Sequence, residues 1–295
     1  MGISTSSRIL GALLVAIPGW CGADTLQKVT SDNTVTVSFR ESAIPFSYLT
    51  PSGQPTGLSV DLTEAIVAEL RSTLKRPQLQ VRYIPVNAQN RIPLLVNGSY
   101  DLECGSTTNN SARGREVAFS ISFFYAGTGL LTKANDGPKN FSDLAGRSVA
   151  TVGGSTNEKV LRQYATDHKL DVSIVLGKDY ADALKLLQDG KASAVALDDV
   201  LLYGMRANAE DPASLAVVGE SLQIEPYGCI VRKDDPAFKQ LVDGVIAKMM
   251  TSGEFSRVYA KWFQSPIPPK GINLSMPMSA QLQKNLKELS DKPAQ

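Results

Sequence analysis

Strand-like and helix-like segments alternate along most of this 295-residue chain. The segment 34–39 is rich in β-branched residues, and 58–74 then carries leucine or isoleucine at every fourth position from Leu62. The first pattern predicts a strand and the second an amphipathic helix. Further strands are predicted at 79–84, 100–104, 148–152, 172–176, 193–197, 215–218 and 227–232, with helices near 91–97, 156–168, 179–189, 199–207 and 235–262. This alternation indicates parallel sheets covered by helices, an α/β fold.

The chain is long enough for two domains or lobes. Two extended, glycine-containing segments, 123–129 and 222–228, bracket a stretch with its own strand-helix alternation and are therefore expected to be paired crossovers. The predicted boundaries are 24–126 with 225–265 for lobe 1, 127–224 for lobe 2 and 266–295 for a C-terminal tail. That tail is expected either to pack on the outside of lobe 1 or to fray.

Residues 1–23 have the pattern of a secretory signal peptide: one positive charge at Arg8, an apolar run, and small residues before the next acidic one. The run is too short to span a bilayer as a helix. A cysteine after such a run can be lipidated once the signal is removed, but Cys21 follows the bulky Trp20 where lipidation sites have a small residue. Cleavage after Ala23 is therefore the preferred prediction, and a lipoprotein is the alternative.

Export changes the interpretation of the two remaining cysteines, Cys104 and Cys229. In an oxidising compartment, an even pair in an otherwise cysteine-free chain is a candidate disulfide. The alternative is a pair of buried thiols in strands. The sequence leaves both open.

Charge and histidine content exclude several functional classes. Thirty basic and 29 acidic side chains without a basic block give no electrostatic footprint for nucleic acid or an anionic membrane. The single histidine, His168, cannot supply a two-histidine zinc site, and a Ser-His-Asp triad would need it. Its polar neighbours place it at the solvated end of a helix. We predict no metal and no cofactor.

Polar clusters follow several predicted strands, at the carboxyl ends where open α/β sheets bind ligands. They are Arg40-Glu41, Gln89-Asn90-Arg91, the run 105–110 with Arg113, the turn 153–156 and Asp198-Asp199. Taken singly, each is most often a helix cap or a solvated surface group. The turn 153–156 leads into a helix and lacks the Gly-Lys-Ser/Thr of a nucleotide-binding loop, so capture of a small anion is the better interpretation.

Together these clusters resemble the type II periplasmic solute-binding proteins of amino-acid ABC transporters, most closely the glutamate/aspartate-binding members. The resemblance covers nearly all of the mature chain and rests on Arg40-Glu41-Ser42, Pro45-Phe46-Ser47-Tyr48, Gln89-Asn90-Arg91-Ile92-Pro93-Leu94-Leu95, the run Glu103 to Asn110, Leu197-Asp198-Asp199, Tyr227-Gly228-Cys229 and Lys261-Trp262-Phe263. It implies two lobes with parallel-rich sheets, joined by two crossover strands and closing on ligand in the cleft. It also implies a periplasmic receptor that delivers L-glutamate or L-aspartate to a membrane permease. We expect a monomer.

The resemblance implies roles for the residues that would hold the amino-acid part of the ligand. Arg113 would clamp the α-carboxylate, assisted by the Thr108 backbone or hydroxyl and, from the other lobe, by Thr156. Asp198 would take the ammonium group, with Ser106 as a second acceptor. Every α-amino acid carries these two groups, so this part of the site would not distinguish one from another.

The resemblance assigns the ligand side-chain carboxylate to Arg40 and Arg91. Three arginines against one aspartate would leave a surplus of two positive charges, which favours a ligand of net charge −1 over glutamine. Ala88 and Tyr180 depart from the family pattern, which has a serine and often a histidine there. Tyr180 can still donate through its phenol. The order of preference between glutamate and aspartate stays open.

Two other functions remain open. A receptor of this kind can feed a sensor kinase instead of a transporter. The same fold also supports a few periplasmic enzymes, including dehydratases of cyclic carboxylates, and Glu41 or Glu103 could serve as an acid in the cleft. Against an enzyme, the polar clusters contain no histidine and no activated nucleophile.

Overall fold

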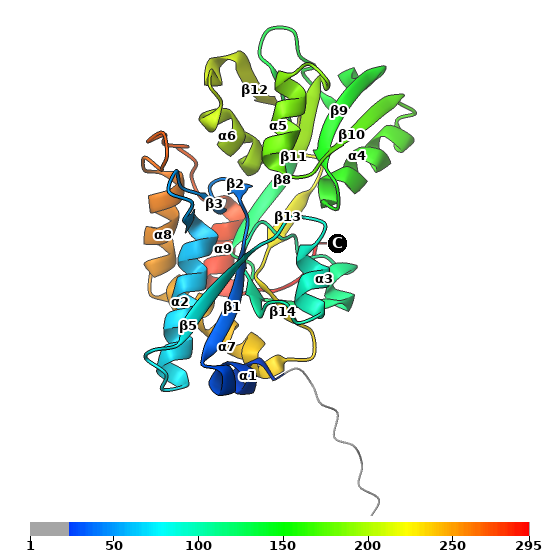
Figure 1. The fold of residues 1–295 in the computed structure, drawn as a ribbon. Coiled ribbons are helices and arrows are strands. Elements are labelled where there is room, and N and C mark those ends of the chain that lie inside the picture. The colour runs from blue at the N-terminus through cyan, green and yellow to red at the C-terminus, as the bar shows by residue number, and fades with distance from the viewer. Residues whose placement is uncertain (1–23, 295) are drawn as a thin grey trace, which may run out of the picture.

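The computed structural model describes residues 24–294, and the predicted signal peptide, 1–23 with Cys21, lies outside them. Lobe 1 is built on a five-stranded sheet, seen in the lower half of Figure 1. Its strands are, in sheet order, β5 (Gln80–Pro85), β1 (Thr34–Phe39), β6 (Leu102–Glu103), β14 (Ile230–Arg232) and β7 (Val117–Phe119). The first three run parallel, and β14 is antiparallel to its neighbours. The helices of lobe 1 are α1 (Thr25–Asp32), α2 (Leu58–Thr73), α3 (Arg91–Val96), α7 (Pro236–Thr251) and α8 (Glu254–Phe263).

Lobe 2 is built on the second sheet, in the upper half of Figure 1. Its strands are, in sheet order, β10 (Val172–Gly177), β9 (Arg147–Val152), β11 (Ala194–Asp198), β8 (Phe124–Lys133) and β12 (Leu215–Val218), and β13 (Ile224–Tyr227) also pairs with β8. Its helices are α4 (Thr156–Asp167), α5 (Tyr180–Gln188) and α6 (Asp199–Asn208), with short 3-10 helices at Phe141–Leu144 and Pro212–Ser214. The first 3-10 helix of the chain, Arg113–Arg115, belongs to lobe 1. Strands β10, β9 and β11 are parallel, so the predicted α/β class with two parallel-rich sheets is confirmed.

The two expected crossovers form one antiparallel ribbon between the lobes. Ile224 pairs with Gly127 and Tyr227 with Phe124, and β8 then continues into lobe 2, where it pairs with β11 and β12. Figure 1 shows β8 and β13 as the connection between the two lobes. We propose the lobe boundaries 24–126 with 225–265 and 127–224, which place both changes of lobe inside this ribbon.

The ribbon is anchored to lobe 1 by aromatic side chains. The ring centroid of Phe46 lies 4.9 Å from that of Phe124 on β8 and 5.3 Å from that of Tyr227 on β13. Phe263 of α8 stacks on Phe124 at 5.2 Å. Phe46 belongs to a small sheet region of β2 (Ser42–Ala43), β3 (Ser47–Leu49) and β4 (Pro55–Thr56). Burial of these rings holds the crossover ribbon against lobe 1. The main apolar core continues from lobe 1 into lobe 2, and a smaller apolar cluster lies within lobe 2.

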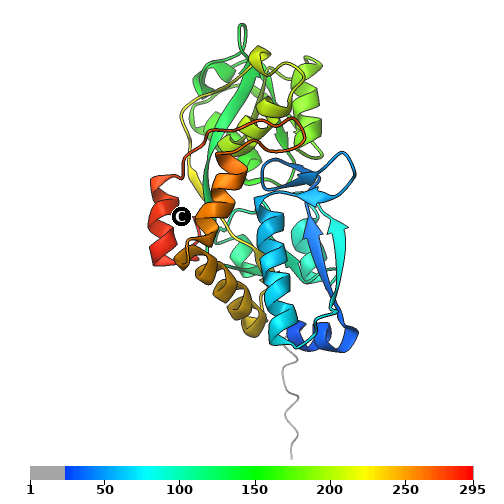
Figure 2. The same ribbon diagram turned by 90° about the vertical axis from the view of Figure 1, so that its left-hand side faces the viewer.

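The C-terminal tail packs against lobe 1 and does not fray, as the first of the two alternatives expected. Helix α9 (Ala280–Glu288) lies against α7 and the start of β8, as Figure 2 shows for α7. The Asn285 amide donates to the Ser122 carbonyl at 2.7 Å, and the Ala294 N–H donates to the Asn109 carbonyl at 2.9 Å. The tail therefore holds the start of the crossover and a loop that carries site residues.

Three predicted elements have a different extent in the structure. The helix predicted at 235–262 is two helices, because Gly253 adopts a left-handed φ of 78° between α7 and α8. The strand predicted at 227–232 is the end of β13 followed by β14, with a break at 228–229. The strand predicted at 100–104 shortens to β6. Helix α1, strand β7 and the small sheet were not predicted.

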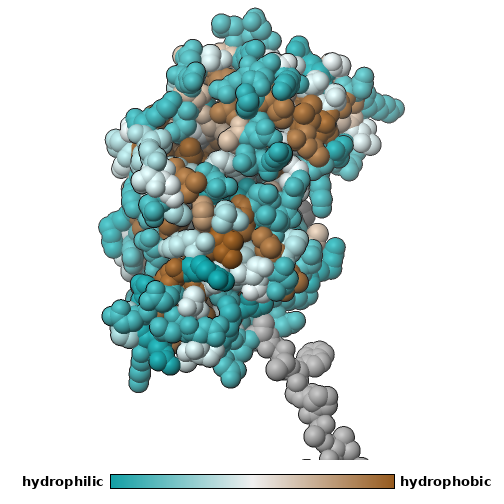
Figure 3. Space-filling model, viewed as in Figure 1, coloured by the Kyte–Doolittle hydropathy of each residue, from teal (hydrophilic) through white to brown (hydrophobic). Residues whose placement is uncertain are grey.

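The surface gives two further observations. Figure 3 shows a mostly hydrophilic face on which hydrophobic residues gather in small areas of both lobes. His168 is exposed at the end of α4, with its ring Nδ1 3.0 Å from the Tyr164 carbonyl, as expected for a solvated helix end. Over residues 24–294 the structure has no helix with the length and apolar character needed to cross a membrane.

Candidate ligand-binding site

The eight predicted site residues come from loops and helix starts that face each other between the lobes. Lobe 1 supplies Arg40 after β1, Arg91 at the start of α3, Ser106 and Thr108 after β6, and Arg113 in the first 3-10 helix, whereas lobe 2 supplies Thr156 at the start of α4, Tyr180 at the start of α5 and Asp198 at the end of β11. All except Thr156 are buried, and Thr156 is half-buried. The carboxyl ends of parallel strands meet at one edge of each sheet, which is why residues far apart in sequence gather here.

Contacts across the cleft show that the lobes are closed on each other. The Ser106 hydroxyl lies 2.9 Å from the Tyr180 phenol, and the Arg40 guanidinium lies over the Tyr180 ring, 4.9 Å from its centroid. Arg113 donates through Nη2 to the Gly154 carbonyl of lobe 2 at 3.2 Å and through Nη1 to the Thr108 carbonyl at 3.0 Å. Tyr180 therefore contacts site residues of lobe 1 although it departs from the family pattern.

Glycine at the turn into α4 permits this close approach. Gly154 has φ of 76°, and a Cβ there would lie 3.1 Å from the Gln89 Cα and 3.2 Å from the Ala88 carbonyl oxygen of lobe 1. A larger residue would strain the turn and hold the lobes apart. The glycine turn therefore serves lobe contact as well as presenting the start of α4.

A turn held by the side chains of two asparagines positions Arg91. The Asn90 side chain accepts from the Asn87 N–H at 2.8 Å, and the Asn87 side chain accepts from the N–H groups of Gln89 and Asn90. Behind it, the Tyr100 hydroxyl donates to the Arg91 carbonyl at 2.6 Å. These local bonds give the Gln-Asn-Arg motif a physical role: they fix the backbone from which the arginine enters the cleft.

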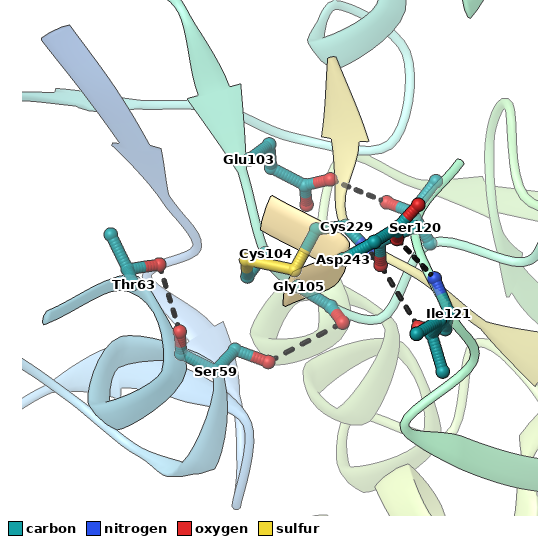
Figure 4. Close-up of a disulfide and its surroundings, with 10 residues drawn as sticks. Ser59, Thr63, Glu103, Cys104, Gly105, Ser120, Ile121, Cys229 and Asp243 are labelled. Atoms are coloured by element: carbon teal, nitrogen blue, oxygen red, sulfur yellow. Dashed lines mark hydrogen bonds between the residues drawn. A yellow bond between two sulfur atoms is a disulfide. The ribbon is translucent and has the colours of Figure 1, made fainter. Parts of the chain in front are cut away.

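A disulfide anchors the residues 105–112, which we call the site loop. Cys104 and Cys229 are bonded, with Cα atoms 4.2 Å apart, so the disulfide is present and the alternative of two free thiols is not. Figure 4 shows the bridge beside Gly105, whose carbonyl accepts from Ser59 of α2 at 3.4 Å. The bridge ties the start of the site loop to the chain between β13 and β14, next to the hinge.

Three buried charged groups in the cluster each have an atom without a hydrogen-bond partner among the described residues. These atoms are Nη1 of Arg40, Nε of Arg91 and Oδ1 of Asp198. Leaving a buried charged group unpartnered costs free energy, and native proteins avoid it. The two arginine donors and one carboxylate acceptor are therefore suited to a ligand with both an anionic and a cationic group.

Burial shifts the protonation of two of these groups. It raises the pKa of the Asp198 carboxyl well above its usual value, and the neighbouring Glu225 carboxylate raises it further. It lowers the pKa of Arg113 to about 10, with Arg91 as the second cause. Arg113 stays charged at neutral pH. A cation placed beside Asp198 would stabilise its ionised form.

Glu225 belongs to the cluster, although the sequence analysis did not select it. It lies on β13, is 1% exposed, and accepts hydrogen bonds from Thr108 and Thr156, each at 2.6 Å. The strand period could have indicated it, because Glu225 lies on the same face as the buried Tyr227. The expected surplus of two positive charges in the site is therefore wrong. Arg40, Arg91 and Arg113 face two carboxylates, Asp198 and Glu225, which leaves a surplus of one, and Glu103 is a further buried acid.

The two carboxylates considered as acids in an enzyme lie in different surroundings. Glu103 is fully buried and accepts from the Thr107 hydroxyl at 2.8 Å. Glu41 lines a pocket of 180 Å³ at the mouth of the cleft, together with Arg40, Asn90 and the lobe 2 residue Lys178. That pocket borders the buried cluster and is lined by both lobes.

Comparison with known proteins agrees with this geometry. A L-glutamate/L-aspartate-binding protein of Pseudomonas aeruginosa is 44% identical over 92% of this chain and 90% of its own length. A glutamate/aspartate import solute-binding protein of Escherichia coli is 42% identical over 91% and 89%. The structure of an ancestral amino acid-binding protein, a precursor of cyclohexadienyl dehydratase, aligns with a TM-score of 0.69 at 28% identity, covering 81% of this chain and 99% of that one.

The model of the family described as bacterial extracellular solute-binding proteins, family 3, matches residues 35–265. This match covers both lobes and all the residues of the cluster. The chain therefore belongs to family 3 of the bacterial extracellular solute-binding proteins.

Proposed function

We propose that this protein is a periplasmic receptor that captures L-glutamate or L-aspartate between its lobes and delivers it to the membrane permease of an ABC transporter. The names of the relatives from Pseudomonas aeruginosa and Escherichia coli support the ligand and the import role. The signal-like residues 1–23 support export. We also propose that it acts as a monomer and has no catalytic role.

The observation that carries the proposal is the set of unpartnered buried atoms. One acidic amino acid supplies an ammonium group for Oδ1 of Asp198 and a side-chain carboxylate for Nη1 of Arg40 and Nε of Arg91. Each contact would pair a buried charge that is otherwise without a partner. The Ser106 hydroxyl would add an acceptor for the ammonium group.

The α-carboxylate is assigned to Arg113 and to backbone N–H groups. The hydroxyls of Thr108 and Thr156 are already bonded to Glu225, so they are not free donors. The N–H groups of these two threonines have no acceptor in residues 24–294, and Thr156 begins α4, where the helix dipole favours an anion. We therefore assign the α-carboxylate contacts of both threonines to their backbones.

We expect the site to distinguish glutamate, aspartate and glutamine more by their charge than by their size. Glutamine would leave the Arg40 and Arg91 guanidinium groups facing a neutral amide, which costs more free energy than a lost methylene contact. Glutamate and aspartate differ by one methylene, which separates them by about 1 to 3 kcal/mol. The phenol of Tyr180 stands between Arg40 and Ser106 and is a further donor for the side-chain carboxylate.

Titration calorimetry with L-glutamate, L-aspartate and L-glutamine tests the proposal. We expect both acids to bind with at least micromolar affinity, about 8 kcal/mol of binding free energy. We expect glutamine to bind much more weakly, because it lacks the second carboxylate. Absence of heat with either acid, or an affinity for glutamine equal to that for glutamate, would contradict the proposal. Protein unfolded and refolded without ligand serves as the control for co-purified ligand.

A further inference from the structure

The end of the C-terminal tail is hydrogen-bonded to the site loop. The side-chain amide of Asn109 donates to the Asp291 carbonyl at 2.7 Å, and the Asn109 carbonyl accepts from the Ala294 N–H at 2.9 Å. Asn109 is 4% exposed and follows Thr108 in the loop. We call residues 290–294 the tail end. Two of its backbone groups are therefore bonded to one buried residue of the site loop.

The crossover strand β13 is the second partner of the site loop. The Asn109 N–H donates to the Pro226 carbonyl at 2.8 Å. Neither this bond nor those of the tail end use the Thr108 N–H, for which residues 24–294 offer no acceptor. The family match ends at residue 265, so one of the two segments that hold the loop lies outside the matched region.

The two neighbours of Asn109 in the chain connect it to the groups that we assign to the ligand α-carboxylate. Before it, Thr108 supplies one of the backbone N–H groups, and its carbonyl accepts from Nη1 of Arg113 at 3.0 Å. After it, the Asn110 side chain accepts from the Arg113 N–H at 3.0 Å, at the start of the first 3-10 helix. A displacement of Asn109 would therefore move both the Thr108 amide and Arg113.

The tail end is itself fixed to lobe 1. The Ser290 carbonyl accepts from the Ser122 N–H at 2.9 Å, and the Ser290 N–H donates to the Asn285 side chain at 2.8 Å. Asn285 is 2% exposed, and its amide donates to the Ser122 carbonyl at 2.7 Å. An ion pair of Asp291 with Lys239 adds little, because the carboxylate is half exposed. Asn285 therefore ties the tail end to the start of the crossover.

We propose that the tail end is a positioning element of the ligand-binding site, and that Asn109 transmits its support to the Thr108 amide and Arg113. Its effect on affinity rests on the proposed function, because a ligand with an α-carboxylate would use these two groups. Its effect on the order of the site loop does not. Arg40 and Arg91 lie outside the site loop, after β1 and in α3. The tail end should therefore support every α-amino-acid ligand equally.

Two single variants, their double mutant and a control test this role in the full chain. Asn109→Ala removes the amide donor, whereas Ala294→Pro removes the N–H donor without changing the site loop. The control, Lys292→Gln, changes an exposed side chain of the tail end and keeps both bonds. Titration calorimetry measures the affinities for L-glutamate and L-aspartate. Hydrogen exchange of the ligand-free protein measures local opening of residues 107–114.

We expect each single variant to weaken both ligands by about three- to tenfold, which corresponds to the loss of one neutral hydrogen bond. The ratio of the glutamate and aspartate affinities should stay that of the wild type. The double mutant should lose less than the product of the two single effects, because both changes loosen the same residue. Amide exchange in 107–114 should be faster in all three, and Lys292→Gln should behave as the wild type.

Wild-type affinities in both single variants would overturn the positioning role, even if their melting temperatures fell, because the tail end would then support the fold alone. A changed ratio of glutamate to aspartate affinity would also overturn it, since the effect would lie on the side-chain part of the ligand. If thermal unfolding shows that Asn109→Ala has lost its fold, Ala294→Pro decides. Failure of the proposed function is a separate result: the wild type would not bind glutamate, and unchanged exchange of 107–114 in the variants would still overturn the positioning of the loop.

Discussion

Asp198→Asn is expected to weaken the binding of L-glutamate, L-aspartate and L-glutamine alike, by more than about thirtyfold. The substitution keeps the shape of the side chain but removes the charge of the unpartnered Oδ1 acceptor, which we assign to the ligand ammonium group. Loss of one member of a desolvated charge pair costs about 2 to 5 kcal/mol, or more than about thirtyfold in affinity. Titration calorimetry measures the loss for all three ligands.

The same substitution should stabilise the ligand-free protein at neutral pH. Burial and Glu225 raise the pKa of Asp198 above its value in the unfolded chain, so the folded state prefers the protonated carboxyl. The stability that this preference contributes is therefore complete below the unfolded pKa and is lost as pH rises through the raised pKa. Asparagine cannot ionise and should remove this loss, giving a higher melting temperature at pH 7 but little change at acidic pH.

Asp199→Asn is the matched control for the binding result. Asp199 is the next residue, and its carboxylate accepts from the Gly127 and Val200 N–H groups, which an asparagine oxygen can also do. This variant should keep its ligand affinities. Binding by Asp198→Asn within a few-fold of wild type would show that Asp198 does not hold the ammonium group. A lower melting temperature for that variant would show that the carboxylate is instead a structural partner.

Arg91→Met is expected to collapse the discrimination between glutamate and glutamine. Methionine approximates the apolar stem of arginine but removes the guanidinium, whose Nε has no partner among the described residues and whose Nη1 reaches only the Ser106 carbonyl at 3.4 Å. Glutamate should lose about a hundredfold in affinity, within the range for a broken buried charge pair. Glutamine should lose much less, because its amide never neutralised that charge. The ratio of the two dissociation constants is the measurement.

Arg82→Met on the exposed side of β5 serves as the control, since it removes an equal charge outside the cleft. It should leave the ratio unchanged. If Arg91→Met weakened glutamate and glutamine by the same factor, Arg91 would be acting on the common α-amino-acid part of the ligand. The assignment of the side-chain carboxylate to Arg40 and Arg91 would then be wrong.

Local patterns predicted much of the fold because they depend on short-range physics. The apolar spacing from Leu62 buries one side of α2, and the β-branched run at 34–39 forms β1. The break at Gly253 was missed since glycine inside a helical pattern is often tolerated, and its left-handed φ is decided by how α7 and α8 pack. The sequence could not decide where the tail packs for a related reason: its bonds to Ser122 and Asn109 are long-range.

The same difference between short-range patterns and long-range contacts decided which site residues could be predicted. Its arginines and Asp198 could be selected because they follow strands and match a family motif. The strand period could have indicated that Glu225 is buried, but not which residues it contacts, because Thr108 and Thr156 lie far away in sequence and in different lobes. The net charge of the cleft was therefore overestimated. Spacing along the chain does not report which buried acid faces which buried base.

The central claim is that the unpartnered atoms of the closed cleft mark the ligand's groups, and a crystal structure with L-glutamate tests it most directly. We predict the ammonium group within hydrogen-bond distance of Oδ1 of Asp198, the side-chain carboxylate on Arg40 and Arg91, and the α-carboxylate on Arg113 and two backbone N–H groups. A ligand bound in the reverse orientation, or one that leaves Arg40 and Arg91 without a carboxylate, would contradict the account.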